Sequence, residues 1–548
     1  MGVRKLAIAF LAGLAACSPS STNAQAARPL RPDAPRLIVA ISVDQLSSDL
    51  YDEYRPHFTG GFKRLASGAA FRNGYQSHAA TETCPGHSTL LTGKRPAMNG
   101  IVANIWLDQK TARADKSIYC AEDESVPGST STEYTVSPAH LNAQTLGDRL
   151  KAISPASRNV AVAGKDRSAV MMAGRNVDQR WYRKGNGFAT DLKGVAVPRA
   201  VTLTNQAVTA ALAQARPALE PPELCAPKAK EYVLSPTLTV GNGRMDRAAG
   251  DGSRFLRSPE FDGATLALAA ALVQEMGLGR GQATDVLSMS LAATDYVGHA
   301  YGSGGMEMCL QMLALDRELG DFLALLDRSG IDYAVVLTSD HGGMDIPERM
   351  RDRGIAGAAR ADSGLEPGEF GKLLAPQVGL TGSVLKGLGI GGDVWVDAAV
   401  PEAQRAAVLR AARERYAAHP QVYAAFTRDE IMAVPMPTES PNSWSIIQRV
   451  RASFDPARSG DLYVVLRQYI SPVVPPSSGY TATHGSPWDY DRRVPILFWR
   501  KGMAASQNEK AVETVDIMPT LAAMIGLAVE PGSVDGKCLT AAGVTCPR

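Results

Sequence analysis

Three histidines and three aspartates in this sequence have surroundings typical of metal ligands. Each histidine lies next to a glycine, near the end of a strand-like run and close to an acid; these are His299, His341 and His484, out of eight histidines. Each aspartate ends a strand-like run; these are Asp44, Asp295 and Asp340. Six such ligands exceed what one ion needs, and imidazole mixed with carboxylate favours zinc over calcium or magnesium. We therefore expect two zinc ions and rank manganese and iron lower.

A turn rich in hydroxyls and glycine, residues 81–93, offers a nucleophile. It leads into a short apolar segment, so a hydroxyl can sit at a helix N-terminus, where unpaired N–H groups can hold an anion. Pro85 suits the first helical position and Gly93 the helix end, which puts Thr83 at or just before the N-cap. Thr83 is the candidate nucleophile and a candidate metal ligand. Taken alone, however, the turn is more simply a capped surface helix. The rival hydroxyls of the same turn are Thr81, Ser88 and Thr89.

Three further polar residues are candidates for the same place. Asn104 lies in a loop that can return an amide side chain to the site, and Lys165 and Arg167 follow a buried strand. If their segment is extended, alternation puts both cations on one side. Taken alone, each has a simpler explanation. An asparagine such as Asn104 is usually just a turn residue, and two cations after a strand usually form a solvent-exposed charged loop. Their role depends on whether the fold brings them to the metal ligands.

The runs that carry these residues predict an α/β fold. Continuous apolar stretches are typical of strands buried on both faces of a parallel sheet, and such sheets place their chemistry at the carboxyl ends of the strands. The expected strands are 36–44, 159–164, 285–291, 333–338 and 494–499, and the expected helices include 264–276, 306–326 and 516–524. Asp295 and His299 can share one ion if the backbone turns between them.

The length of the chain favours one large domain with insertions. We expect a single catalytic domain over residues 27–548, interrupted at about 176–261 and 345–480. The first interruption is rich in Pro, Gly and Ala with weak periodicity, and the second contains an expected helix at 401–418 and a strand at 462–466.

The N-terminus predicts export. Arg4-Lys5, an apolar run and a stretch ending in Ala26 together predict a signal peptide over residues 1–26, too short to span a bilayer. A lipoprotein signal ending before Cys17 is the rival interpretation. The mature chain is therefore expected to be periplasmic or secreted, or tethered to the outer membrane through Cys17, with no transmembrane segment.

Composition and cysteines limit the partners. The net charge is only +2 and there is no basic stretch suited to a nucleic-acid backbone, so we expect no nucleic-acid binding beyond nucleotide substrates. The six cysteines after Cys17 make disulfides plausible in an exported chain, and the spacing of Cys538 and Cys546 suits a local pair. Fifteen pairings of six cysteines are formally open. We expect a monomer.

The motifs, taken in order, resemble the alkaline phosphatase superfamily over most of the mature chain. They are Asp44, Thr83-Cys84-Pro85-Gly86-His87, Asp295-Tyr296-Val297-Gly298-His299, Asp340-His341-Gly342 and His484-Gly485. The closest branch uses threonine and includes the nucleotide pyrophosphatase/phosphodiesterases. The resemblance implies a three-layer sandwich with a central mostly parallel sheet, helices on both faces and two insertions forming a cap. It also implies one zinc on Asp295, His299 and His484, and the other on Asp44, Asp340 and His341 with Thr83.

Bacterial threonine-dependent alkaline phosphatases of this branch carry an asparagine and a Lys-x-Arg pair that grip the phosphoryl oxygens, matched here by Asn104, Lys165 and Arg167. The phosphodiesterases are not expected to have that pair. A monoester has an extra negative oxygen that two cations can compensate. The resemblance therefore implies a phosphoric monoester hydrolase for small phosphate esters. We expect two in-line displacements through a phosphothreonine at Thr83.

Two alternatives stay open at this point. The same dimetal core can serve a phosphodiesterase or nucleotide pyrophosphatase, and a metal-stabilised binding protein can keep the fold without turnover. Cys84 occupies a variable position beside the nucleophile, and the insertions can reshape access to the site. The natural ester and an additional structural Ca²⁺ are not decided by the sequence.

Overall fold

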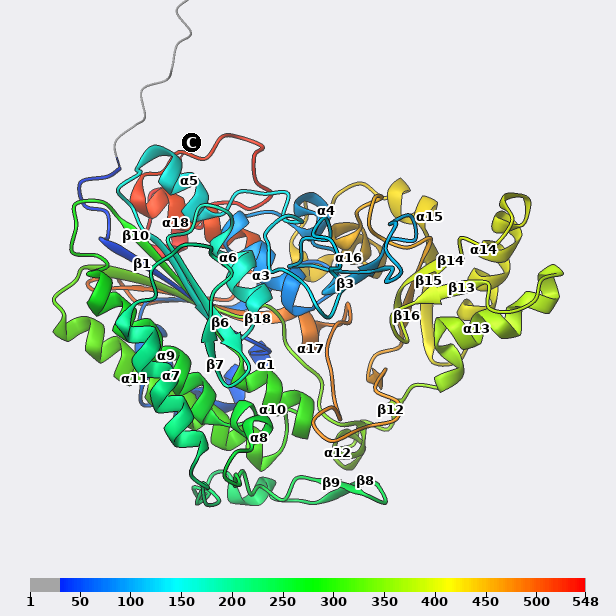
Figure 1. Cartoon of the computed structure of the whole chain (residues 1–548), viewed down its shortest axis with the longest axis horizontal. Helices are drawn as coiled ribbons and strands as arrows, with labels where there is room; N and C mark the ends of the chain where they lie inside the picture. Colours follow the sequence, from blue (N-terminus) through cyan, green and yellow to red (C-terminus); the bar gives the residue numbers. More distant parts are fainter. Residues whose placement is uncertain (1–29, 548) are drawn as a thin grey trace, which may run out of the picture.

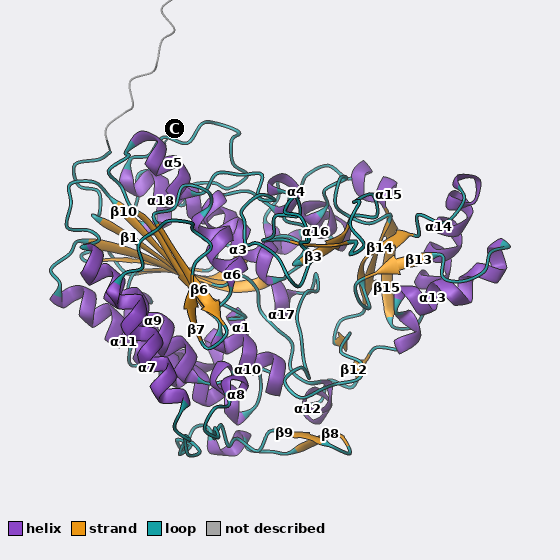
Figure 2. Ribbon diagram, viewed as in Figure 1, coloured by secondary structure: helices purple, strands orange, loops and turns teal. Residues whose placement is uncertain are grey.

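A ten-stranded, mostly parallel sheet forms the centre of the computed structural model, which describes residues 30–547. The expected export signal and Cys17 lie outside the described residues. Figures 1 and 2 show the sheet with helices packed on both sides. Its strands, in spatial order, are β19 (Ser506–Asn508), β2 (Ala69–Tyr75), β18 (Arg493–Arg500), β11 (Tyr333–Thr338), β1 (Leu37–Val43), β10 (Asp285–Leu291), β5 (Asn159–Ala163), β6 (Gln179–Lys184) and β7 (Gly187–Ala189), with β20 (Val512–Glu513) pairing β2.

Alternation along β1 shows why helices cover both faces. Leu37, Val39 and Ile41 pack into one core with α9 (Pro259–Met276) and α11 (Met306–Arg328). Ile38 and Ala40 pack into another with α3 (Thr83–Thr92) and α18 (Ile517–Ile525). A strand that buries both faces is mostly apolar, and all seven residues of β1 are buried, with Ser42 as its single polar residue. The predicted α/β sandwich is therefore confirmed.

Most of the helices lie outside the region of residues 367–466. They are α1 (Ser48–Tyr54), α2 (Gly61–Leu65), α3 (Thr83–Thr92), α4 (Pro96–Asn99), α5 (Leu146–Ile153), α6 (Asp166–Ala173), α7 (Arg199–Leu212), α8 (Gly252–Leu256), α9 (Pro259–Met276), α10 (Ala293–Tyr301), α11 (Met306–Arg328), α12 (Pro347–Asp352), α17 (Asp489–Arg492) and α18 (Ile517–Ile525). Short strand pairs lie outside the central sheet: β3 (Ile105–Leu107) with β4 (Ser117–Tyr119), β8 (Tyr232–Ser235) with β9 (Leu238–Val240), and β12 (Ala359–Arg360) with β17 (Ile470–Ser471).

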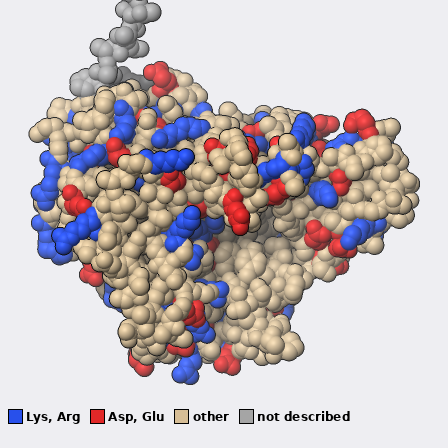
Figure 3. Space-filling view, in the orientation of Figure 1, with Lys and Arg blue, Asp and Glu red and all other residues tan. Residues whose placement is uncertain are grey.

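A four-stranded sheet with its own core lies apart from the central sheet (Figure 1). It consists of β13 (Leu385–Gly387), β14 (Gly392–Val396), β16 (Leu462–Leu466) and β15 (Val422–Thr427), accompanied by α13 (Pro367–Leu374), α14 (Glu402–Ala417), α15 (Arg428–Ala433) and α16 (Ile446–Ser453). The face shown in Figure 3 is hollowed between the two parts. All of these elements fall within the expected second insertion.

The segment expected as the first insertion is divided between core and surface. β6 pairs in parallel with β5, and β7 pairs with β6, so both strands extend the central sheet. The sequence Gln179–Lys184 was not expected as a core strand because it is polar at both ends and apolar only at its middle. The division of the chain into one domain with two insertions stays a prediction.

The central strands end together at one edge of the sheet. β1 pairs in parallel with both β10 and β11, and β10 with β5, so residues that follow these strands meet there. Three disulfides join described cysteines: Cys84 with Cys120, Cys225 with Cys309, and Cys538 with Cys546, the last as predicted. Among residues 30–547, no helix has the length and apolar character needed to cross a membrane.

Candidate metal and nucleophile site

Two groups of candidate metal ligands form at this edge of the sheet. One contains Asp295, His299 and His484, and the other contains Asp44, Asp340 and His341. Within the first, the Nε2 atoms of His299 and His484 lie 3.3 and 3.5 Å from Asp295 Oδ1. Within the second, His341 Nε2 lies 3.4 Å from Asp44 Oδ1 and 3.3 Å from Asp340 Oδ2. All six predicted ligands are thus brought together as the predicted two sets.

Asp44, Asp340 and His341 lie after the strands expected to deliver them, whereas Asp295 and His299 lie on a helix in place of the expected turn. Asp44 follows β1, and Asp340 and His341 follow β11. Asp295 and His299 both lie on α10, so their spacing of four places them one helical turn apart on the same face.

Backbone carbonyls fix the orientation of all three imidazoles. The Nδ1 atoms of His299, His341 and His484 lie 2.8 Å from the carbonyl oxygens of Ala482, Gly342 and Thr81, respectively. A carbonyl only accepts, so Nδ1 carries the proton in each ring and Nε2 keeps a lone pair directed into its group. This is the arrangement of metal-ligating histidine.

The donor set fits zinc. Buried Asp44 Oδ1, Asp295 Oδ1 and His341 Nε2 have no hydrogen-bond partner among residues 30–547, a costly state that a bound cation relieves. Tetrahedral ligands at zinc distances of about 2.0–2.1 Å lie roughly 3.3 Å apart, which matches the separations within both groups. Burial also lowers the pKa values of His341 and His484, which favours the neutral ring that a metal requires.

The two groups are neighbours. The rings of His341 and His484, one from each group, stack with centroids 3.6 Å apart. Lys165 Nζ lies 2.7 Å from Asp44 Oδ2 and 2.6 Å from Asp295 Oδ2, so a single ammonium contacts a carboxylate of each group. Although burial opposes its charge, Asp295 and Asp44 raise the pKa of Lys165 above its ordinary value. The charged Lys165 side chain therefore lies between the two groups.

Thr83 lies at the start of α3 rather than at its cap. Glu82 is the N-cap, and the helix ends at Gly93, which has a φ of +69°. Pro85 is accordingly the third helical residue, a position that still needs no intrahelical N–H bond. Gly86 allows α3 to approach the second group closely, since a Cβ there would lie 2.0 Å from the carbonyl oxygen of Asp340. The Thr83 side chain is fully buried at the site.

Lys165 and Arg167 both reach the Thr83 hydroxyl. Lys165 Nζ and Arg167 Nη2 each lie 3.3 Å from Thr83 Oγ1. They point together for a reason other than strand alternation, because Lys165 is the N-cap of α6 and Arg167 is in its first turn. Two cations converge on the candidate nucleophile.

Asn104 is held beside the same helix by three hydrogen bonds. Its N–H donates to Glu82 Oε2 (2.7 Å), its Oδ1 accepts from the N–H of Cys84 (2.7 Å), and its carbonyl accepts from the N–H of Cys120 (2.9 Å). The disulfide between Cys84 and Cys120 closes this arrangement. Because Oδ1 is engaged, the amide NH₂ group is the part of Asn104 left to bind an oxygen.

Two residues of the site were given no role from the sequence. Glu82 supports Asn104, and burial raises the pKa of its carboxyl. His87 Nδ1 lies 2.9 Å from the Thr83 carbonyl and 3.1 Å from Asp340 Oδ2, and its Nε2 lies 3.0 Å from Ser290 Oγ. The only signal in the sequence was their presence in the same turn as Thr83.

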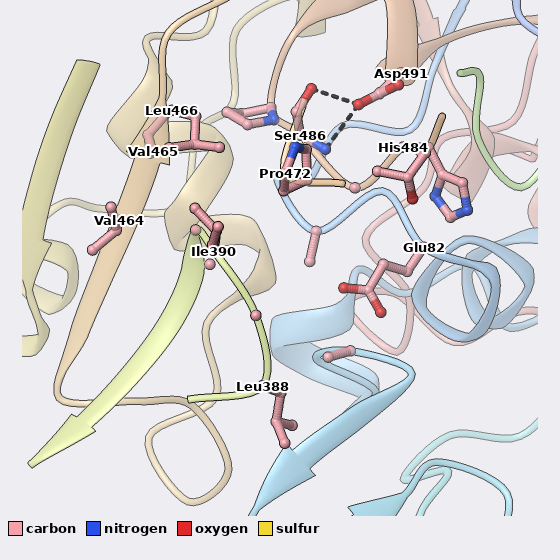
Figure 4. Close-up of a pocket in the computed structure, with 18 of the residues that line it drawn as sticks. Glu82, Leu388, Ile390, Val464, Val465, Leu466, Pro472, His484, Ser486 and Asp491 are labelled. Carbon is pink, nitrogen blue, oxygen red and sulfur yellow. Dashed lines mark hydrogen bonds between the residues drawn. The ribbon is translucent and has the colours of Figure 1, made fainter. Parts of the chain in front are cut away.

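A cavity of about 620 Å³ opens beside these residues. Figure 4 shows Glu82 and His484 on one side and apolar residues of the four-stranded sheet region on the other. Those apolar residues are Leu388, Ile390, Val464, Val465 and Leu466. Arg167, Asn104 and His299 also line the cavity, so it connects the ligand groups to an apolar wall. A small molecule held at Thr83 has room to extend towards that wall.

A mostly parallel sheet with two adjacent aspartate–histidine groups and a buried threonine at a helix start is the architecture of the alkaline phosphatase superfamily. The family model described as type I phosphodiesterase / nucleotide pyrophosphatase matches residues 38–487. The chain therefore belongs to that family.

Individual relatives agree with this assignment. Alkaline phosphatase PhoK of a Sphingomonas species is 51% identical, over 94% of this chain and 92% of the relative. Alkaline phosphatase PhoD of Zymomonas mobilis is 45% identical, over 93% of this chain and 89% of the relative. The crystal structure of alkaline phosphatase PafA matches with a TM-score of 0.80 at 25% identity, covering 93% of this chain and 99% of that one.

Proposed function

We propose that this enzyme is an exported, zinc-dependent alkaline phosphatase that hydrolyses phosphate monoesters through a phosphothreonine at Thr83. The observation that carries the proposal is the pair of 3.3 Å distances from Lys165 Nζ and Arg167 Nη2 to Thr83 Oγ1, beside two groups of metal-type ligands. The activity named for the two relatives above, at 51% and 45% identity, supports it.

The residues divide the work as follows. Asp295, His299 and His484 would hold one zinc, and Asp44, Asp340 and His341 the other together with Thr83. Zinc bound there would supply Lewis acidity that lowers the pKa of the attacking hydroxyl groups and stabilises the leaving oxygen. Asn104, Lys165 and Arg167 bind the nonbridging phosphoryl oxygens, where preorganised donors contribute most to the rate.

The reaction proceeds in two displacements. Thr83 Oγ attacks phosphorus in line, the bond from phosphorus to the ester oxygen breaks, and the alcohol leaves. Water then attacks the phosphothreonine, the bond from phosphorus to Thr83 Oγ breaks, and inorganic phosphate leaves. Lys165 and Arg167 compensate the dianionic charge of a monoester, which a diester does not have.

The same metal core favours one second candidate, phosphodiester hydrolysis, because the matching family model is described by that activity. An activity panel on the purified chain, with metal analysis, decides between them. We expect an aryl phosphate to be hydrolysed in preference to the corresponding aryl phosphodiester, and Thr83→Ala to remove both activities. A strong preference for the diester would overturn the monoesterase proposal, and no hydrolysis by zinc-loaded protein would favour a binding protein.

We also propose that the enzyme works as a monomer in an oxidising compartment, the periplasm or the outside of the cell. The three disulfides support this location, since such bonds rarely persist in a reducing cytosol. Fractionation of the native host would test it, with activity expected outside the cytosol.

A further inference from the structure

Arg167 lines a second cavity in addition to the one beside Glu82. This cavity has a volume of about 540 Å³, and its wall includes Lys165, Arg167, Arg183 and Lys184. Lys165 and Arg167 are the residues that reach Thr83 Oγ1. The second cavity therefore adjoins the phosphoryl-binding end of the proposed site. Its wall also carries Arg183 and Lys184, two cations to which the proposed site gives no role.

The register of the central sheet explains why four cations meet here. β5 and β6 are parallel, with Ala163 opposite Tyr182. Lys165 and Arg167 come just after the end of β5, and Arg183 and Lys184 are the last two residues of β6. The cations thus gather at the carboxyl ends of two adjacent strands, where α/β sheets bind ligands.

The acidic residues of the cavity wall are Asp166 and Glu133, and Lys165 already contacts Asp44 and Asp295 behind it. Asp166 accepts hydrogen bonds of 2.7 Å each from the hydroxyls of Tyr119 and Tyr134 and from the N–H of Arg167. Glu133 is exposed and lines the same cavity. Arg183 and Lys184 make no ion pair or side-chain hydrogen bond with any part of the chain from residue 30 to 547.

We propose that this cavity is a second oxoanion subsite, which binds another phosphate while the reacting phosphate lies at Thr83. The proposal rests on the monoesterase function proposed above. Cations in a concave site focus potential and bind phosphate oxygens through charge-assisted hydrogen bonds. The bound group is either the second phosphate of a substrate that carries two, or a free inorganic phosphate ion.

The test compares the double variant Arg183→Gln/Lys184→Gln with wild type and with Lys193→Gln/Arg199→Gln. The control removes the same charge at two exposed positions outside both cavities. In the first arm, kcat/KM is measured for alkanediol bisphosphates of increasing length and for the matching alkyl monophosphates. We expect wild type and control to prefer a bisphosphate, and the double variant to lose about tenfold of that preference.

In the second arm, inhibition of aryl phosphate hydrolysis by inorganic phosphate is measured. The inhibition curve is fitted with one or with two bound phosphate ions per chain. Loss of the bisphosphate preference in the first arm assigns the subsite to a substrate group. A change from two ions to one in the double variant assigns it to free phosphate. No difference between the double variant and the control in either arm overturns the subsite. If wild type hydrolysed no monoester at all, the proposed function itself would fail instead.

Discussion

Glu82 Oε2 accepts a hydrogen bond of 2.7 Å from the backbone N–H of Asn104. Asn104 Oδ1 in turn accepts from the N–H of Cys84, the residue after Thr83. These two bonds leave the NH₂ group of Asn104 to bind a phosphoryl oxygen in the proposed reaction. We therefore expect Glu82 to act on the proposed reaction through Asn104, as a positioning residue.

Replacing Glu82 tests this arrangement. We expect Glu82→Ala to lower kcat/KM for an aryl phosphate about tenfold, because a net hydrogen bond of about 1–1.5 kcal/mol is lost. Glu82→Gln keeps an accepting oxygen and restores most of the rate. In an Asn104→Ala background, Glu82→Ala should cost little more, since the two residues act as one unit. Full additivity of the two losses, at unchanged thermal stability, would exclude the positioning role.

Lys165 and Arg167 should set the preference for monoesters. In the variant Lys165→Ala/Arg167→Ala, kcat/KM for an aryl phosphate should fall by on the order of 100-fold or more, because two charge-assisted contacts to the phosphoryl group are lost. The corresponding diester should lose much less, since it has one negative oxygen fewer. The measurement is the ratio of the two constants, and an equal loss for both esters would contradict a role in discrimination.

Thr83 should carry the phosphoryl group during turnover. Acid quenching of the enzyme during hydrolysis of an aryl phosphate, followed by peptide mass spectrometry, should give a phosphorylated Thr83 peptide. Thr83→Ser should give phosphoserine in the same peptide, whereas Thr83→Ala should give none and lose activity. Phosphate found on Thr81, Ser88 or Thr89 instead would identify one of these rivals as the nucleophile.

Buried Asp262 should make stability depend on pH. Its Oδ1 accepts from the N–H of Ala293 at the start of α10, and burial raises its pKa to about 7 from an ordinary value of 3.8. A raised pKa means that the folded state binds more protons than the unfolded state between these values. This contribution is therefore fully present below about pH 4 and is lost as the pH rises through about 7.

Asp262→Asn cannot ionise and should escape this loss. Between pH 5 and pH 8 the variant should gain stability relative to wild type by at most about 3 kcal/mol. Urea unfolding of both proteins at the two pH values gives the difference, in which effects common to both cancel. A free energy difference that stays constant with pH would show that Asp262 is ionised in the folded protein at pH 5.

Residues that end apolar runs were the most predictable part of the site. The strands at 285–291 and 333–338 have the predicted bounds, since a strand buried on both faces has an unmistakable pattern. The candidate ligands that follow these strands, Asp295 on α10 and Asp340 after β11, were predicted from the rule that parallel strands finish at one edge. Only the folded structure shows that His299 and His484 lie close to Asp295. Their glycine neighbours and nearby acids in the sequence nevertheless marked both histidines as candidate ligands.

Local geometry was less predictable than the sets of residues. Lys165 and Arg167 point together because they lie at the start of a helix, and Asp295 and His299 because they lie one helical turn apart. In such short segments, a spacing of two or four residues does not distinguish a helix from an extended chain. β6 was missed because its terminal cations conceal a short apolar centre. Those same cations form the wall of the second cavity. The support of Asn104 by Glu82 and Cys120 could not be predicted, since it depends on three loops meeting.

The central claim is that two groups of three ligands each hold a zinc ion beside Thr83. Crystals of the purified enzyme, measured on both sides of the zinc absorption edge, test it directly. The predicted result is two anomalous peaks, one bounded by Asp295, His299 and His484 and the other by Asp44, Asp340, His341 and the Thr83 oxygen. A single peak, or peaks remote from Thr83 in fully active protein, would contradict it.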